Sequence, residues 1–394
     1  MSADDKTNPS RLERNDQLIV EATASLLSEE GWAALTLAGV AHRAGLSARP
    51  VRDRYPDRLT LAAQAWERLI SPGWSESMAA VIATATSGDA QALKSALAPF
   101  ADPGPVHGAA VELLLVAAHD EDVRAVVTPA ALRPIEEALD PANGPAVAAA
   151  RGYAVMMALG LLLESWRNTA AGLDLTAPLA HLAPVLSIPG EPVPLPLERA
   201  THLDEGPVIE TGDPLWDAVL VATLRQVGTR GYEAATVEAI VAEAGCSQSV
   251  LFRRYATKSD AFFDATRRMA GGAMALNVAY QQKVATEHSP GVAEAVMMRE
   301  FMRPGREIER VIGLEQYRLT RHHEQLRADV EAEQAAVQSA YLESLAHLPQ
   351  AEARARLHLE LAMGMGTVLL SQLVTNSWQL PYDVITVPLI DGVP

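Results

Sequence analysis

The chain has 394 residues, of which 49% are hydrophobic and 21% are charged, and its formal net charge is −17. This length allows more than one hydrophobic core, and the acidic balance argues against a generally basic nucleic-acid-binding surface. The one cysteine, Cys246, excludes an internal disulfide and fits a reducing cytoplasm. We expect it to be a small apolar plug in a turn rather than a redox sensor.

The N-terminal segment Met1–Arg14 is polar and charged, which predicts that no signal peptide begins the chain. The most apolar stretch, residues 155–163, is shorter than a membrane span and is followed by Glu164 and Arg167. We therefore expect a cytoplasmic protein that does not associate with a membrane.

Residues 10–65 contain a pattern typical of two short helices joined by a tight turn. Thr36 can cap the first helix, whose apolar residues within 37–41 share one side. Gly45 then ends this helix in a left-handed conformation, and Ser47 is expected to cap the second helix. The pattern predicts a helix-turn-helix, with an ordinary helical hairpin as the alternative.

Long Ala- and Leu-rich segments, interrupted by prolines, follow in residues 66–186 and predict a helical body. The helices expected in this body cover 105–119, 121–138 and 146–170. Residues 187–213 contain several prolines and predict an extended, semi-rigid linker.

The pattern of residues 10–65 then returns at an offset of 200, so that Gly45-Leu46-Ser47 is matched by Gly245-Cys246-Ser247. Residues 214–268 therefore predict a second helix-turn-helix, and residues 269–394 a second helical body. The helices expected in this second body cover 290–302, 305–347 and 350–378. The similarity extends weakly into the bodies, where residues 119–127 resemble 322–330. No alternating strand pattern competes, so we expect an all-helical fold made of two units.

Both turn regions are islands of positive charge in an acidic chain. Residues 46–58 hold four arginines against two aspartates, and residues 246–258 hold three cations and no carboxylate. A helix that lies in a DNA major groove presents such groups to phosphates and base edges. Arg58 and Lys258 also open the next helices, where a cation opposes the helix dipole unless an anion such as a phosphate docks there.

Both stretches resemble the DNA-binding end of TetR-family transcriptional regulators, whose pattern runs Thr-Val-x-x-Ile-Ala-x-x-Ala-Gly-Val-Ser-x-x-x-Leu-Tyr-x-His-Phe-x-x-Lys. The resemblance implies that the partner is a double-stranded DNA operator, whose bases are read at positions 48, 49, 248 and 249. The DNA-binding residues that it implies are Thr36, Ser47, Ala48, Arg49, Arg52, Arg54, Arg58, Thr236, Ser247, Gln248, Ser249, Phe252, Arg253, Arg254 and Lys258.

The sequence departs from the family pattern at several of these positions. Arg52 and Phe252 stand where the family usually has Tyr, and arginines replace its usual His at positions 54 and 254. Pro50 lies within the first turn of the first recognition helix, where a missing N–H is tolerated, so the helix need not break. The two units are therefore expected to read different half-sites.

Regulators of this family usually pair through the last two helices of their bodies. Residues 146–160 and 362–366 are rich in Ala and Gly, which suits close helix packing. The resemblance therefore implies an intramolecular pseudo-dimer that reads an asymmetric operator, since covalent linkage raises the effective concentration of the two units. The alternative is further dimerisation of the chain, which would present four helix-turn-helix units.

In the family, the helical body holds a ligand pocket, which here implies a hydrophobic small-molecule effector. Methionines and aromatic residues at helical spacing are the candidates, although such residues are more often plain core. The candidate ligand-binding residues are Met156, Trp166, Met298, Phe301, Met302, Tyr317, Met363 and Trp378.

No phosphate-binding loop, nucleophile elbow or Cys/His set at metal spacing occurs, so we expect no enzyme, no cofactor and no metal site. The adjacent His322 and His323 would point about 100° apart on a helix and are expected at the surface, and the many carboxylates are expected on solvated faces. Two functions remain: a ligand-responsive regulator, most simply a repressor, or a helical ligand-binding or interaction protein whose helix-turn-helix units no longer read DNA.

Overall fold

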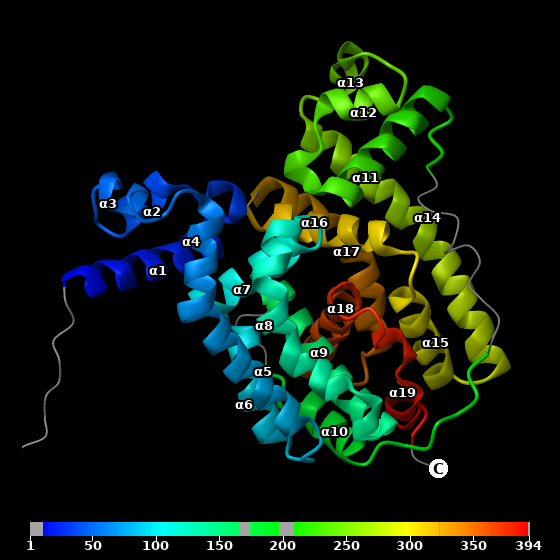
Figure 1. The fold of residues 1–394 in the computed structure, drawn as a ribbon. Helices are drawn as coiled ribbons and strands as arrows, with labels where there is room; N and C mark the ends of the chain where they lie inside the picture. The colour runs from blue at the N-terminus through cyan, green and yellow to red at the C-terminus, as the bar shows by residue number, and fades with distance from the viewer. Residues whose placement is uncertain (1–10, 166–173, 197–208, 323, 393–394) are drawn as a thin grey trace, which may run out of the picture.

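The computed structural model describes residues 11–165, 174–196, 209–322 and 324–392, and every regular element in these ranges is a helix. This confirms the expected all-helical fold. Figure 1 shows the two predicted helix-turn-helix regions, around α3 and α13, at separate extremities of a central helical body.

The first half of the chain begins with a long helix and two short ones, which are followed by the helices of the body. These elements are α1 (Arg11–Glu30), α2 (Leu37–Arg43), α3 (Ala48–Arg52), α4 (Arg58–Ala65), α5 (Ser71–Ala85), α6 (Ala90–Ala101), α7 (Pro105–Ala117), α8 (Glu121–Leu139), α9 (Pro145–Glu164) and α10 (Thr176–Ser187). A single π-helical turn, Trp66–Ile70, joins α4 to α5, so the two form one continuous rod.

The second half has its elements in the same order, with the single helix α14 in the place of the rod α4–α5. The elements are α11 (Pro214–Ala234), α12 (Val237–Glu243), α13 (Gln248–Arg254), α14 (Lys258–Glu287), α15 (Pro290–Met302), α16 (Glu307–His322), α17 (Glu324–Ser344), α18 (Gln350–Leu373) and α19 (Asp383–Ile390). Helix α1 packs on α7 as α11 packs on α16, and α10 packs on α6 as α19 packs on α15.

The helices predicted over 105–119, 121–138 and 290–302 are confirmed as α7, α8 and α15. The one helix predicted over 305–347 corresponds to two, α16 and α17, the second of which ends at Ser344. Because Gly305 takes a left-handed φ of 95°, α16 begins only at Glu307. The helix predicted over 350–378 ends early, at Leu373, because Val374 is extended. Residues 166–170 of the predicted helix 146–170, and residue 323, lie outside the described residues.

Helix α9 corrects the expectation that no segment is long and apolar enough to span a membrane. Its 20 residues include a window of mean hydropathy 1.8, but 83% of that window is buried within the protein. It packs against α18, α5, α6 and α8. Its apolar character is therefore accounted for by its place at the centre of the core.

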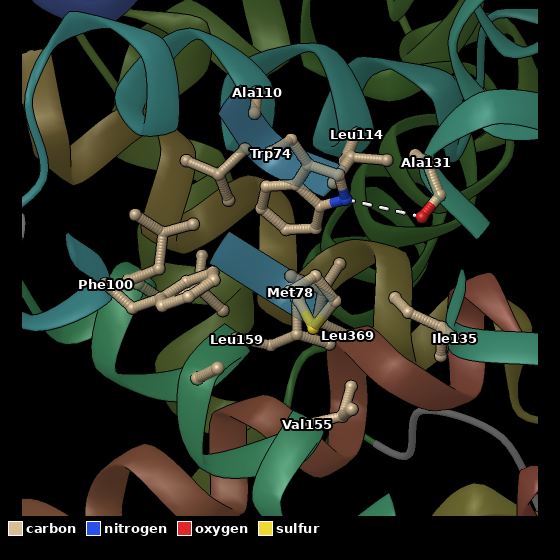
Figure 2. Close-up of a cluster of buried hydrophobic side chains, with 14 of the residues drawn as sticks. Trp74, Met78, Phe100, Ala110, Leu114, Ala131, Ile135, Val155, Leu159 and Leu369 are labelled. Atoms are coloured by element: carbon tan, nitrogen blue, oxygen red, sulfur yellow. Dashed lines mark hydrogen bonds between the residues drawn. The ribbon is translucent and has the colours of Figure 1, made fainter. Parts of the chain in front are cut away.

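The main hydrophobic core includes side chains from both halves of the chain. In Figure 2, Trp74 and Met78 of α5 and Val155 and Leu159 of α9 surround the same space as Leu369 of α18. The indole of Trp74 is fully buried, and its Nε1 donates a hydrogen bond to the carbonyl oxygen of Ala131 at 3.3 Å. Because α18 completes this core, the second half of the chain stabilises the first.

Helices α9 and α18 approach each other through glycines. A Cβ atom built on Gly160 would lie 1.7 Å from the carbonyl oxygen of Ala362, and one on Gly366 would lie 1.8 Å from the carbonyl oxygen of Met156. Both neighbouring atoms are backbone, so they cannot rotate away. The hydroxyl of Thr367 also donates to Met156 Sδ at 3.3 Å. The Ala- and Gly-rich segments predicted to pack closely are therefore in direct backbone contact.

Residues 190–193 of the predicted linker run beside α19, whereas Ile209 packs in the core of the second head. The N–H of Gly190 donates to the carbonyl oxygen of Val384 at 2.8 Å, and the N–H of Val193 donates to the carboxylate of Asp383 at 2.7 Å. Residues 197–208 of the predicted linker lie outside the described residues.

Candidate nucleic-acid interface

Two regions carry the candidate interface: the first head (residues 11–65, α1 to α4) and the second head (residues 214–268, α11 to the start of α14). In each, the threonine predicted as N-cap is confirmed. The hydroxyl of Thr36 accepts the N–H of Gly39 at 3.0 Å, and that of Thr236 accepts the N–H of Ala239 at 3.2 Å. Each threonine thus satisfies one of the unpaired donors at a helix start.

The turns of the two heads have the same backbone conformation. Gly45 has φ 67° and Gly245 has φ 68°, the left-handed region in which glycine is favoured. In each turn the N–H of the next residue, Leu46 or Cys246, donates at 2.9 Å to a carbonyl five residues earlier. This is the hydrogen bond of a Schellman-type helix end, so the predicted stop signals are correct in both heads.

The prediction that Ser47 and Ser247 cap the second helices is wrong as far as their side chains are concerned. Both occupy the N-cap position, but neither side chain makes a capping hydrogen bond. The hydroxyl of Ser247 instead pairs with that of Ser249 at 2.8 Å. Because both serines are exposed, their hydroxyls face solvent at the tips of the heads.

Most of the predicted DNA-binding residues are exposed on these tips. The exposed ones are Thr36, Ser47, Arg49, Arg52, Arg58, Thr236, Ser247, Gln248, Ser249, Phe252, Arg253 and Arg254, whereas Ala48, Arg54 and Lys258 are partly buried. The Arg49 side chain is 88% exposed and lies 3.7 Å from Asp53. Helix α3 forms despite Pro50, as expected, but has five residues where α13 has seven.

Several of the predicted cations already have partners within the chain. Arg54 pairs with the carboxylate of Asp16 on α1, and Arg254 lies over the ring of Trp216 on α11 at 5.0 Å. Positions 16 and 216 are equivalent at the offset of 200, so both heads hold this arginine against their first helix. The two arginines are thereby fixed beside the tips.

The cations at the starts of α4 and α14 have an explanation that needs no bound anion. Arg58 stacks over the ring of Trp32 at 4.6 Å. The ammonium of Lys258 donates to the carbonyl oxygens of Tyr232 at 2.5 Å and Ala235 at 2.7 Å, and it lies 4.0 Å from the Tyr232 ring. Burial lowers the pKa of Lys258, against the opposing effect of nearby carboxylates. These contacts offset the unfavourable position of a cation at a helix start.

The described members of the predicted ligand-binding set lie in or beside the helical core. Met156, Met298, Met302 and Met363 are buried in the main core, and Tyr317 and Trp378 pack against it. The hydroxyl of Tyr317 donates to the carboxylate of Glu164 at 2.7 Å. Phe301 is partly buried, and the guanidinium of Arg306 stacks over its ring. Trp166 and His323 lie outside the described residues, as does the side chain of His322.

A pocket of about 400 Å³ lies elsewhere, between the second head, α14 and the helices α16 and α17. Its lining combines apolar and charged side chains and includes Arg254, Tyr255, Asp264, Arg268 and Asp329. The hydroxyl of Tyr255 donates to Asp264 at 2.6 Å; burial and this carboxylate raise the pKa of Tyr255 to about 12. None of the predicted ligand-binding residues lines this pocket.

Two buried carboxylates attach the heads to the body. Glu112 on α7 accepts the backbone N–H of Trp32 at 2.7 Å, and Glu315 on α16 accepts that of Tyr232 at 2.9 Å. Trp32 directly follows Gly31, and Tyr232 directly follows Gly231. Each of these glycines has a positive φ and ends the first helix of its head. The expectation that carboxylates lie on solvated faces is therefore wrong for these two. Each is buried and accepts hydrogen bonds from a backbone N–H and from an arginine.

The pKa of Glu315 makes this attachment sensitive to acid. Burial would raise that pKa, but the charge of Arg318 and the hydrogen bonds from His119 and Arg318 outweigh it and lower the pKa from 4.5 to about 2. A depressed carboxyl pKa contributes stability that is complete above the unfolded value and is lost as pH falls towards the folded value.

We therefore expect the wild-type chain to lose about 1–2 kcal/mol more unfolding free energy than Glu315→Gln between about pH 5 and about pH 3. Urea unfolding at several pH values within this window measures the difference. Parallel pH dependences in the two proteins would contradict the assigned ionisation.

Taken together, the geometry defines an all-helical protein with two exposed, locally basic helix-turn-helix tips on a shared body. Residues 219–265, which cover most of the second head, match the family model of bacterial regulatory proteins of the tetR family. This match supports a DNA-binding transcriptional regulator of that family. No curated protein matches the chain.

Proposed function

We infer that the chain is a ligand-responsive DNA-binding transcriptional regulator in which two TetR-like units on one polypeptide pair as an intramolecular pseudo-dimer. The DNA-binding function is carried by the second head. Its sequence matches regulatory proteins, and its helix α13 presents Gln248, Ser249, Arg253 and Arg254 to solvent. Amide, hydroxyl and guanidinium groups on one exposed helix are suited to base edges and phosphates.

The pairing of the two units is supported by the contact between α9 and α18. Gly160 meets the backbone of Ala362, and Gly366 meets the backbone of Met156. Gly160 and Gly366 are separated by 206 positions, as are Met156 and Ala362. Residue i of one unit thus touches residue j of the other, and the reverse also holds, which is the signature of a two-fold interface.

The first head is the weaker of the two proposed readers. It lies outside the matched residues, its α3 is short, and its Arg54 is paired with Asp16. It nevertheless repeats the threonine cap and the glycine turn of the second head, and it exposes Arg49 and Arg52. Since Ala48 and Arg49 stand where the second head has Gln248 and Ser249, the proposed operator has two different half-sites.

Release of the operator by a hydrophobic effector, and hence a role as a cytoplasmic repressor, completes the proposal. Two places in the chain are proposed for the effector: the methionine-bearing core helices of the body and the pocket beside the second head. A coupling free energy of about 1–3 kcal/mol between effector and DNA is sufficient for such a switch.

Selection from a random duplex library, followed by gel-shift titration at several salt concentrations, tests the function. We expect an enriched, non-palindromic motif whose complex weakens steeply with salt, because phosphate contacts release counterions. If the chain enriches no motif and retards its own upstream DNA no better than random duplex, the heads do not read DNA. The chain would then act as a helical ligand-binding or interaction protein.

A further inference from the structure

The carboxylates that attach the two heads are joined to each other by a single buried arginine. Arg318 on α16 donates through Nε to Glu315 at 2.9 Å and reaches Glu112 of the other half at 3.4 Å. It also pairs with Glu233 at the end of α11. The side chains of Arg318, Glu112 and Glu315 are each at most 3% exposed. One guanidinium therefore connects the attachment points of the two heads, Gly31-Trp32 and Gly231-Tyr232, which we call the hinges.

A second cross-contact reinforces this bridge. His119, at the end of α7, hydrogen-bonds Glu315 through Nε2 at 3.1 Å. Its ring also fills the space beside Gly231, where a Cβ atom would lie 2.4 Å from the imidazole. Arg321 approaches Glu112 at 3.6 Å from the same side as Arg318. The junction thus contains charged groups from both halves, and the His119 ring packs against Gly231.

The bridge depends on the two halves being different. Glu112 and Glu315 occupy equivalent places, seven residues before His119 and His322, but the position equivalent to Arg318 is the buried Leu115. Two arginines at equivalent positions would bring like charges together at this junction. Arg318 instead contacts one carboxylate from each half, because its planar fork can reach several oxygens at once.

Resting on the proposed function, we propose that Arg318 is a positioning residue that fixes the two heads at one mutual distance and so selects the spacing between the half-sites. It touches no DNA. Each head is tied through one backbone N–H to its carboxylate, and both carboxylates are tied to Arg318. Loss of this side chain frees the hinges to move independently, whereas the recognition helices keep their own structure.

The direct test measures the distance between the heads without DNA. Spin labels are placed at His42→Cys and Ala242→Cys in a Cys246→Ser background, because positions 42 and 242 are equivalent and exposed. Pulsed electron–electron double resonance then measures the distance between the two labels in wild type and in Arg318→Met. We expect one narrow distance distribution in wild type and a clearly broader one in Arg318→Met, with Arg318→Lys in between.

The matched control is Arg310→Met. Arg310 lies on the same helix, is also buried, and contacts Glu307 and the carbonyls of Phe301 and Arg303, none of which belongs to the junction. We expect it to lower stability and leave the distance distribution narrow. If Arg318→Met does not fold, Glu112→Gln replaces it, since the amide oxygen still accepts the N–H of Trp32 but carries no charge for Arg318.

The second readout is the spacing preference on DNA. The affinity ratio between the selected operator and one with the half-sites moved apart by a base pair should fall about tenfold in Arg318→Met. A narrow distance distribution in every folded variant, or equal broadening in Arg310→Met, overturns the proposal. Because the distance measurement needs no DNA, a chain that binds no operator would refute the proposed function and leave the positioning role testable.

Discussion

Replacing Gly160 by alanine is expected to lower the free energy of unfolding by about 3 kcal/mol, which is at the upper end of overpacking effects. The new Cβ atom would lie 1.7 Å from the carbonyl oxygen of Ala362 and 2.9 Å from its Cα, so α9 and α18 must move apart. Because these helices join the two halves of the core, the loss spreads over both. The gain in helix propensity, about 1 kcal/mol, only partly offsets it.

The matched control is Gly364→Ala, two residues beyond Ala362, the residue of α18 that Gly160 contacts. A Cβ atom on Gly364 meets nothing within 4 Å, so alanine there should be neutral or slightly stabilising. Denaturant unfolding of both variants measures the difference. If Gly160→Ala is as stable as Gly364→Ala, the close backbone approach of α9 and α18 does not exist.

Removing the two exposed arginines of the first recognition helix, with Arg49→Ala and Arg52→Ala together, should weaken operator binding about 100-fold or more. Base and phosphate contacts of this kind each contribute about 1–3 kcal/mol, and two linked heads bind in an effectively intramolecular step. The salt dependence of binding should also become shallower, by about one ion equivalent for each phosphate contact that is lost.

The control for this experiment is Arg133→Ala. Arg133 on α8 is as exposed as the recognition-helix arginines, at 79%, and pairs only weakly with Glu137 one turn away. The substitution Arg133→Ala removes one positive charge outside the two tips. It should leave the operator affinity within about twofold of that of wild type. Equal losses in the two proteins would mean that net charge, not the tip of the first head, determines binding.

The heads were the most predictable part of the molecule, because their signals are local. Thr36 and Thr236 cap as expected, and Gly45 and Gly245 adopt the left-handed conformation that the repeated tripeptide implied. The serine caps failed because the choice between capping the helix and facing solvent depends on the rotamer, which sequence does not specify.

The junction between the halves could not be predicted, because its partners lie about 80 to 200 residues apart in the chain. Glu112 did carry a signal: it is the one acidic residue of an otherwise apolar helix, α7, and such a residue must find a donor in the interior. Arg318 gave no comparable signal, since α16 is rich in charge.

The length of the apolar helix α9 was underestimated from the sequence. Only its packing shows that an apolar helix of this length belongs to the core.

Sedimentation equilibrium of the chain with its selected operator tests the central claim most directly. That claim is that one polypeptide brings two non-identical heads to one duplex. The account predicts a single specific complex whose protein mass is that of one chain, 42.1 kDa, on a non-palindromic site. A complex that contains two chains on a palindromic site, or no complex above the background of random duplex, would contradict it.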